Sequence, residues 1–389
     1  MTRLLFTLLA ILVNGCTDYA QELPLTPCTF SETINPDYSK AFELQHVLDE
    51  LVTKGVPGAA VAIYSNEGWW AASAGLAKIE SNTTMEKCNL QYLQSIAKTY
   101  MAVAILKLYE QGKIDLQAPI EQYLPKKYHP YLPNVSTISV YMLLNHTSGL
   151  PEYNFQPAYV SKLLSHPDYL FKSEEYLGFI KGKPLDFKPG SKYSYRNTNY
   201  LVLALIADAI TGDHAAYLSQ QIFAPIGLTN TYYHHESGYL TYSNLVNTYW
   251  DRYSNSVVEN VSQMQQTNVK SLVGDDGIVA TPIDAVKFLK SLIEKEILSE
   301  QTLELMKTWV NDKEGKPTYG LGLDYATFNN KTAYGHSGGG LGSGCNLYYF
   351  PEKNVYVFIA INLGTVTDSP IFKKAEPILD KFFEILLRD

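Results

Sequence analysis

A serine and a lysine three residues apart, Ser95 and Lys98, form the one Ser-x-x-Lys pair in this chain of 389 residues. They open an apolar run that extends to Leu108, and this pattern predicts a buried helix that ends near Gly112. Because side chains three residues apart share a helix face, the amine would lie beside the hydroxyl and activate it as a nucleophile. The helix dipole would favour negative charge at the same end. The alternative is a helix cap followed by a solvated lysine.

The segment Tyr195-Arg196-Asn197 is the second candidate, although Tyr-x-Asn by itself is a weak motif. Tyr242-Ser243-Asn244 and Tyr253-Ser254-Asn255 match it too, but both lie in polar, loop-like sequence. Tyr195 instead follows a Pro-Gly turn at 187–190 and precedes an apolar helix predicted over 199–211. A loop held between a sharp turn and a buried helix is a good mount for functional side chains. The alternative is a turn tyrosine that only packs.

A glycine-rich stretch begins at His336 and continues through Ser337, Gly338, Gly339 and Gly340. Glycines at a strand edge let a ligand approach the backbone closely. An imidazole and a hydroxyl beside them can bind a carboxylate or an oxyanion. The alternative is a flexible turn with an incidental histidine.

The other histidines offer less chemistry. His146 follows a helix predicted over 140–144 and could act as a base, but its place in a tight turn favours a turn-stabilising role. His234 and His235 are adjacent in the sequence, a spacing that does not suit two metal ligands on one helix. Because no His/Cys spacing in the chain indicates a metal site, the sequence predicts no metal and no cofactor.

Composition and charge exclude some classes of protein. Hydrophobic residues make up 46% of the chain and charged residues 18%, which is typical of a folded globular protein rather than a disordered one. The formal charge of −8 and the lack of a basic block exclude nucleic acid as an expected partner. The sequence carries no signal for the oligomeric state.

The N-terminal residues predict export. Arg3 precedes an apolar stretch that is too short to span a bilayer, so residues 1–15 are typical of a signal peptide. The segment that ends at Cys16 resembles a bacterial lipoprotein signal, in which Cys16 would be the lipidated mature N-terminus and the membrane anchor. Residues 16–39 would form a tether in the periplasm or cell envelope. The alternatives are an ordinary signal peptide cut nearby and an uncleaved anchor.

Three further cysteines, Cys28, Cys88 and Cys345, would enter an oxidising compartment after export. We favour a Cys28–Cys88 disulfide, because both residues precede the Ser95 helix. Three free thiols are the alternative.

The order of predicted elements indicates an α/β fold of the α+β type. A helix and a hairpin open the chain, and strands and a long helix close it, so the two ends would build one antiparallel sheet flanked by helices. The middle would form a mainly helical lobe, with the site in the cleft between the lobes. The predicted domain spans 40–389, with a sheet lobe at about 40–94 and 286–389 and a helical lobe at about 95–285. The expected strands lie at 59–64, 69–74, 319–325, 346–350 and 355–361, and the expected terminal helices at 42–53 and 371–387.

The three motifs, in this order and with wide spacings, resemble the serine β-lactamase-related superfamily. The resemblance is to the branch of class C β-lactamases, D,D-carboxypeptidases and family VIII esterases, and it covers most of the chain. Four framing phrases are also similar to this family, at 55–58, 146–150, 188–190 and 225–228. The resemblance implies a β-lactamase/transpeptidase-like fold.

The resemblance also implies catalytic roles. Ser95 would be the acylated nucleophile, and Lys98, if desolvated, would be neutral and accept the serine proton. Tyr195 would be a partner base or would relay the proton to the leaving group. Asn197 would hold a substrate amide or orient Lys98.

The third motif would bind the substrate. His336, Ser337 and Gly338 would contact its carboxylate or ester tail, and the backbone N–H groups of Ser95 and Gly339 would form the oxyanion hole. Class C β-lactamases carry lysine where this chain has His336, and a neutral imidazole attracts a carboxylate less than an ammonium does. The departure favours carboxypeptidase and esterase members of the superfamily.

A second departure is Arg196, which stands where serine is common in the family. It would bring a positive charge to the rim of the cleft or face solvent. Taken together, the sequence predicts an exported serine hydrolase with a Ser95 acyl-enzyme, acting as a D,D-carboxypeptidase or esterase on a small-molecule or peptidoglycan-derived substrate. The alternatives are a β-lactamase, a slow-turnover penicillin- or muropeptide-binding protein, and a structural cell-envelope lipoprotein.

Overall fold

A computed structural model of the chain describes residues 32–234 and 238–388. The predicted signal peptide at 1–15, the lipidation site Cys16, most of the predicted tether and Cys28 lie outside the described residues. Residues 32–39 of the predicted tether are described, and they pack against the fold. Ile34 forms a bridge with Trp69, and Tyr38 is buried and stacks on Trp70 with ring centroids 5.6 Å apart.

In the described chain, strands of the large sheet come first and last and most helices lie between them, which is the predicted order. The helices are α1 (Ala41–Thr53), α2 (Ala97–Glu110), α3 (Val140–Leu144), α4 (Pro157–Ser165), α5 (Ser173–Gly178), α6 (Asn197–Thr211), α7 (His214–Leu218), α8 (Ser262–Ser271), α9 (Pro282–Ile293), α10 (Glu300–Met306) and α11 (Pro370–Leu387). The strands are β1 (Gly58–Ser65), β2 (Gly68–Lys78), β3 (Thr83–Thr84), β4 (Gln91–Tyr92), β5 (Thr231–Tyr232), β6 (Tyr249–Trp250), β7 (Glu259–Asn260), β8 (Val279–Ala280), β9 (Val310–Asn311), β10 (Pro317–Tyr319), β11 (Asp324–Phe328), β12 (Lys331–Gly339), β13 (Gly344–Phe350) and β14 (Val355–Ile361).

One antiparallel sheet joins the two ends of the described chain, and this confirms the predicted fold class. Its strand order is β3-β2-β1-β14-β13-β12-β11-β10-β9, so the N-terminal hairpin pairs directly with the last strand. The register places Val61 opposite Ile359 and Ala72. Every residue of β14 is buried, because helices cover both faces of this central strand.

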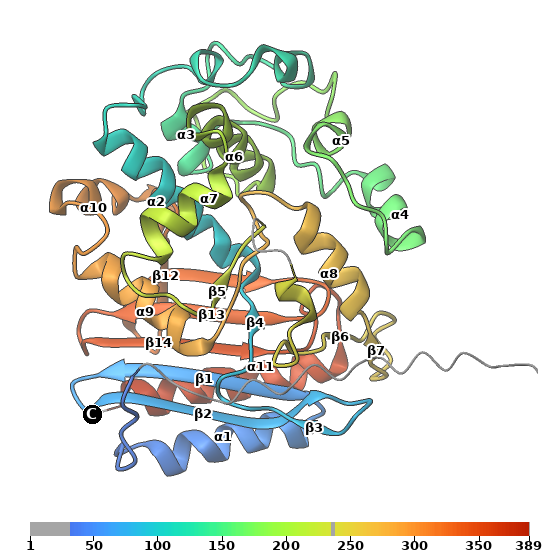
Figure 1. The fold of residues 1–389 in the computed structure, drawn as a ribbon, viewed down its shortest axis with the longest axis vertical. Coiled ribbons are helices and arrows are strands. Elements are labelled where there is room, and N and C mark those ends of the chain that lie inside the picture. The colour runs from blue at the N-terminus through green and yellow to red at the C-terminus, as the bar shows by residue number, and fades with distance from the viewer. Residues whose placement is uncertain (1–31, 235–237, 389) are drawn as a thin grey trace, which may run out of the picture.

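Two helical layers enclose the sheet (Figure 1). Helices α1 and α11 lie on one face, where their apolar sides pack with the strands into one cluster of buried residues. Helix α9 lies on the other face against β1, β13 and β14. Helices α2, α3, α6 and α7 gather beyond β12 and form a second apolar cluster. Helix α9 begins at Pro282 and packs on the sheet. The lobe boundary expected at 285–286 stays a prediction.

Helix α2 forms where the apolar run predicts it, and Gly112 follows its end with φ +68°. Nearly all of its side chains are buried, as expected for a helix that is apolar on most faces. Within the described residues no single helix is long and apolar enough to cross a membrane. Helix α6 and residues 214–223 pass that test only as a pair bent by 84°.

The prediction of one strand over 319–325 is wrong. The chain instead turns between β10 and β11, because Gly322 has φ +85° and ends the extended backbone. This turn packs on α2: the Gly322 carbonyl accepts a hydrogen bond of 2.8 Å from the Thr99 hydroxyl. A Cβ atom at Gly322 would lie 2.2 Å from the Cβ of Ala102.

Of the cysteines in the described residues, Cys88 is disulfide-bonded and Cys345 is a buried free thiol. The alternative of three free thiols is therefore wrong for Cys88. The other half of the favoured Cys28–Cys88 pair lies outside the described residues, so the pairing itself stays a prediction.

We expect Gly322→Ala to lower the free energy of unfolding by about 2–4 kcal/mol, because the new methyl group adds a clash with Ala102 to an unfavourable φ. Gly315→Ala is the matched control, since Gly315 has φ +81° but a methyl group there would meet no atom within 4 Å. The control should lose only about 1 kcal/mol. Urea denaturation of both variants measures the difference, and equal losses would contradict the close approach to α2.

Candidate active site

Ser95 lies in a tight turn between β4 and α2. Residues Gln94–Ile96 form one turn of 3₁₀ helix that leads directly into α2, so Ser95 sits at the positive end of the helix dipole. Gln94 has φ +50°, a strained conformation for a residue with a side chain, and its amide donates a hydrogen bond of 2.6 Å to the Ser343 hydroxyl. The turn presents Ser95 to a cavity.

The Lys98 amine is fully buried directly behind Ser95. Its Nζ atom lies 3.0 Å from Ser95 Oγ and donates a second hydrogen bond of 2.9 Å to the main-chain carbonyl of Asp275. Burial lowers the pKa of Lys98, although the nearby carboxylates of Asp275 and Asp276 act in the opposite direction. A neutral amine at this distance can accept the serine proton.

The Tyr195 hydroxyl contacts the same serine. Its side chain hydrogen-bonds to Ser95, and Lys98 Nζ lies 5.0 Å from the centre of the Tyr195 ring. Burial raises the pKa of Tyr195 well above its usual value, and the hydrogen bond to Ser95 offsets this only in part. Tyr195 is therefore a neutral phenol, which suits a proton relay better than a base.

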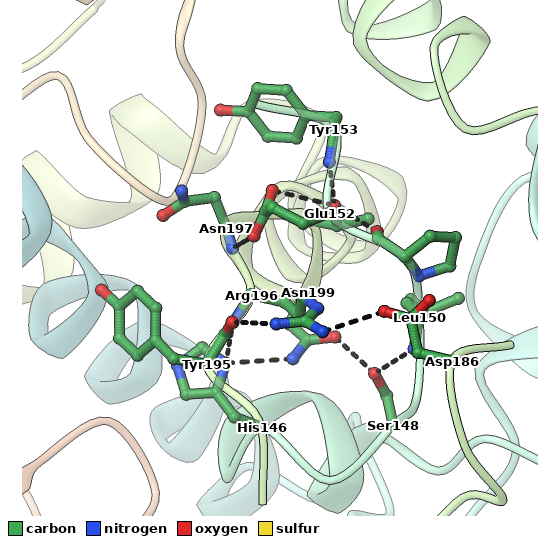
Figure 2. Close-up of polar contacts among 12 residues, drawn as sticks. His146, Ser148, Leu150, Glu152, Tyr153, Asp186, Tyr195, Arg196, Asn197 and Asn199 are labelled. Atoms are coloured by element: carbon green, nitrogen blue, oxygen red, sulfur yellow. Dashed lines mark hydrogen bonds and ion pairs between the residues drawn. The ribbon is translucent and has the colours of Figure 1, made fainter. Parts of the chain in front are cut away.

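His146 supports the ring of Tyr195 rather than the reacting atoms (Figure 2). The two ring centroids are 4.4 Å apart, and His146 Nδ1 accepts hydrogen bonds from the Arg196 main-chain N–H and the Asn199 amide. These donors leave the proton on Nε2. Burial lowers the pKa of His146 well below its usual value, so the ring is neutral. His146 thus stabilises the turn and holds Tyr195, in the role that its sequence context favours.

The Tyr195–Asn197 segment is also held by ion-pair and capping contacts. Arg196 forms a salt bridge of 2.9 Å with Asp186 and donates a hydrogen bond of 2.9 Å to the Tyr195 carbonyl (Figure 2). Arg196 therefore braces the loop instead of lining the cleft. The buried Glu152 carboxylate accepts the Asn197 main-chain N–H at the start of α6, where a negative charge is favourable.

The third motif lies on β12, and His336 and Ser337 are not among the residues that line the nucleophile's cavity. His336 is buried, with Nε2 at 3.0 Å from the Tyr319 hydroxyl and Nδ1 at 2.6 Å from the Ser337 carbonyl. Burial lowers the pKa of His336. Ser337 and Gly338 line a different cavity, between the sheet and α11. The predicted contacts of these three residues with substrate stay predictions.

Gly338 has a structural role that only glycine can fill. A Cβ atom there would lie 2.6 Å from the Leu93 carbonyl and 2.8 Å from Cys345 Sγ. The missing side chain lets β12 approach the turn that carries Ser95.

A cavity of about 760 Å³ opens in front of Ser95. Asn197 and Gly339 line it together with Ser95, so the fold brings together three of the residues predicted from separate motifs. The predicted oxyanion hole of Ser95 and Gly339 is compatible with this placement and stays a prediction. Tyr253, from a Tyr-x-Asn match that the sequence disfavoured, also lines the cavity, whereas Tyr242 packs on Tyr232.

The sequence reasoning missed two acidic residues in the wall of this cavity. Asp275 and Asp276 belong to a Gly-Asp-Asp-Gly segment at 274–277 that predicts only a turn. The signal in the sequence that could have indicated a functional site was the pair of adjacent aspartates between two glycines. The segment is packed against α6, because a Cβ atom at Gly274 would lie 2.2 Å from the Tyr200 carbonyl. That packing aims the Asp275 carbonyl at Lys98.

Comparison with known proteins identifies the class to which this fold and site belong. Residues 44–373 match the family described as Beta-lactamase. Because the match covers most of the chain, the chain belongs to the beta-lactamase family, within the superfamily of serine hydrolases that share the β-lactamase/transpeptidase fold.

Two relatives and one solved structure show the extent of the similarity. A Bacillus subtilis (strain 168) protein provisionally named penicillin-binding protein PbpX is 31% identical over 236 residues, which are 60% of this chain and 52% of the relative. An Escherichia coli (strain K12) protein provisionally named D-alanyl-D-alanine carboxypeptidase is 26% identical over 236 residues, which are 57% of this chain and 54% of the relative. The chain thus spans about half the length of the curated relatives it matches.

The structural similarity extends over nearly the whole fold. The D-amino acid amidase from Ochrobactrum anthropi SV3, crystallised with L-phenylalanine, superposes with a TM-score of 0.77 and 25% sequence identity. The superposition covers 90% of this chain and 99% of the amidase.

We expect the acylation of Ser95 to need the neutral form of Lys98. Its rate should rise with pH through a pKa that lies below 10.5, the ordinary value for lysine, because burial disfavours the ammonium. Lys98→Arg should lower the rate by about 10³-fold or more, since a guanidinium does not lose its proton. The burst of p-nitrophenol released from p-nitrophenyl acetate measures acylation across the pH range.

The matched control is Lys107→Arg, which alters a lysine near the other end of α2. Its acylation rate and pH profile should stay within about twofold of the wild type. An unchanged rate in Lys98→Arg would contradict the assignment of Lys98 as the base.

Proposed function

We propose that this protein hydrolyses amide or ester bonds through an acyl-enzyme on Ser95, as a D,D-carboxypeptidase or a related amidase. The observation that carries the proposal is the hydrogen bond of 3.0 Å between the Ser95 hydroxyl and the buried amine of Lys98. A lysine that served only to cap a helix or pair with a surface carboxylate would keep its charge in water. Here the Lys98 amine is buried away from water and contacts the Ser95 hydroxyl, and Ser95 lines a cavity.

Each residue then has a step in the reaction. Ser95 Oγ attacks the substrate carbonyl carbon while its proton passes to the neutral Lys98 amine. The negative charge that develops on the carbonyl oxygen would be stabilised by backbone N–H groups at Ser95 and Gly339. The carbonyl–nitrogen or carbonyl–oxygen bond breaks when the leaving group takes a proton relayed through the Tyr195 hydroxyl.

Deacylation would follow the same route in reverse. A water molecule attacks the ester carbonyl of the acyl-enzyme and gives up a proton to the Lys98 amine. Ser95 Oγ then leaves and takes a proton back from Lys98 or Tyr195. The half-buried Asn197 side chain lies in the cavity wall, where it can hold a substrate amide. The product is a carboxylic acid, and the enzyme returns to its initial state.

The relatives support amides as the substrate class. The names of the similar proteins refer to D-alanyl-D-alanine carboxypeptidase, penicillin-binding protein and D-amino acid amidase. All three names fit acyl transfer from an amide, with a peptide, a β-lactam or an amino acid amide as the donor. A stable penicilloyl-enzyme without turnover is the second candidate, and the penicillin-binding relative favours it.

We expect a fluorescent penicillin to label Ser95, and p-nitrophenyl acetate to be turned over. In Ser95→Ala the label should disappear and turnover should fall by at least about 10³-fold, because Ser95 carries the one hydroxyl among the described residues to which the Lys98 amine donates a hydrogen bond. Ser81→Ala is the matched control, since Ser81 is an exposed serine remote from the cavity lining. Peptide mapping locates the label, and steady-state kinetics measures turnover.

The outcomes separate the candidates. Labelling with turnover supports a hydrolase, and stable labelling without turnover supports the penicillin-binding role. Neither labelling nor turnover in the wild type would overturn both.

We also propose that the protein is exported and anchored to a membrane through acyl chains on Cys16. The support is the short apolar stretch that ends in Leu-Val-Asn-Gly-Cys at 12–16. Mass spectrometry of the protein made in a bacterium with its full N-terminus should find a mature chain that begins at lipidated Cys16. Cys16→Ser should move the protein to the soluble fraction. An unmodified N-terminus beyond residue 16 would contradict the anchor.

A further inference from the structure

Two carboxyl groups in the cavity, from Asp275 and Asp276, have no part in the acylation chemistry. Both line the cavity that Ser95 faces. Among the described lining residues Arg252 carries the one cationic side chain, and it lies over the rings of Trp250 and Tyr253, 5.5 and 5.7 Å from their centroids. No ion pair joins it to either carboxyl group in the described part of the chain.

The Asp275 carboxyl group is buried and only half satisfied. The residue is 4% exposed, and its Oδ2 atom accepts a hydrogen bond of 2.7 Å from the Tyr153 hydroxyl. Its Oδ1 atom is buried without any hydrogen-bond partner among the described residues. Lys98 does not fill this place, since its amine donates to the main-chain carbonyl of Asp275 and to Ser95. A buried carboxylate oxygen without a donor is costly, so the geometry suits a donor that a ligand brings.

Asp276 adds a second carboxyl group to the lining of the cavity. Its Oδ1 atom accepts the Gly277 N–H at 2.6 Å. Burial raises the pKa of Asp276 to about 7, and the charge of Asp275 acts in the same direction. Burial also raises the pKa of Asp275. The protein by itself stabilises these carboxylates poorly, and a cation bound in the cavity near them would favour their charged forms.

The main chain of Asp275 lies close to the bond that Ser95 would attack. One amine, Lys98 Nζ, contacts both Ser95 Oγ and the Asp275 carbonyl, so these two oxygens are less than about 6 Å apart. In an aminoacyl group the amine nitrogen lies only about 2.5 Å from the carbonyl carbon. An amine within a few bonds of the scissile carbonyl would therefore lie in the cavity that both carboxyl-bearing residues line.

One part of the cavity wall is apolar. Helix α4 and the residues before it contribute Phe155, Val160, Leu163 and Leu164 to the cavity lining. Phe155 is 72% exposed and Val160 40%, so part of this apolar surface has no partner in the fold. An apolar side chain of the substrate would cover it, with the amine directed at the acidic pair.

We propose that Asp275 and Asp276 bind a protonated amine on the acyl part of the substrate, so that the enzyme selects acyl groups that combine an amine with an apolar side chain. The site excludes acyl groups with a carboxylate in the same position, because like charges repel at short range. The selection of substrates rests on the proposed hydrolase function, whereas binding of the amine can be measured without turnover.

The test compares three ligands of similar size: 2-phenylethylammonium, its neutral N-acetyl derivative and the anion 3-phenylpropanoate. Ligand-observed NMR titrations of the wild type should give a dissociation constant for the ammonium at least about tenfold below that of the neutral compound, with the anion weakest. Asp275→Asn and Asp276→Asn keep the side-chain volume, and each should reduce the tenfold preference to about twofold or less. Asp380→Asn, on the exposed side of α11, is the matched control and should keep the preference.

Hydrolysis of p-nitrophenyl acetate by the wild type is measured in parallel. Turnover with equal binding of the ammonium and the neutral compound overturns the amine site and leaves the hydrolase function standing. If the wild type prefers the ammonium and both aspartate substitutions remove that preference, the result supports the amine site. This holds even if the wild type does not turn over p-nitrophenyl acetate and the hydrolase proposal is overturned. A preference that survives both substitutions overturns the assignment to Asp275 and Asp276, and circular dichroism of each variant confirms that the comparison is made on folded protein.

Discussion

The burial of one lysine amine is the constraint on which the site depends. Removing an ammonium from water costs several kcal/mol, so Lys98 is stable in the core only as a well-bonded amine whose pKa is lowered. The Ser95 hydroxyl and the Asp275 carbonyl supply its hydrogen bonds. Each of these two groups is itself held by packing: the first by the 3₁₀ turn before α2, and the second by the contact of Gly274 with α6. The reactive state of Lys98 is thus a consequence of tertiary packing.

The same burial determines the charge of the neighbouring groups. Tyr195 stays a phenol, and His146 and His336 stay neutral imidazoles, because burial disfavours their ions. These three side chains therefore bring no formal charge to the nucleophile, whereas the carboxyl groups of Asp275, Asp276, Glu152 and Asp324 are near enough to act on the pKa of Lys98. A site of this kind responds to the charge that a ligand brings, since hydrogen bonds and ion pairs are stronger where water is excluded.

Some features were predictable because they depend on local pattern. The apolar run after Ser95 forms α2, the hairpin turn at 65–68 joins β1 and β2, and Pro282 opens α9 after a Thr281 cap. Other features depend on contacts between distant segments, which a single sequence does not encode in any short motif. The bracing of the Tyr195 loop by Asp186 and the capping of α6 by Glu152 are of this kind. So is the burial of His336 against Tyr319, which places its ring 6.1 Å from the ring of Tyr195.

The sequence by itself determined which residues could do chemistry: a Ser-x-x-Lys pair at a helix start, a tyrosine in a constrained loop and a glycine-rich strand, in the order of a known superfamily. It also determined the antiparallel sheet, because apolar strands at both ends of a chain need partners. The protonation states and the cavity, by contrast, depend on how the whole chain folds. A pKa depends on how completely water is removed, and the wall around Ser95 comes from segments as distant as Gln94, Asp275 and Gly339. Desolvation is a property of the assembled core, and no local stretch of sequence carries it.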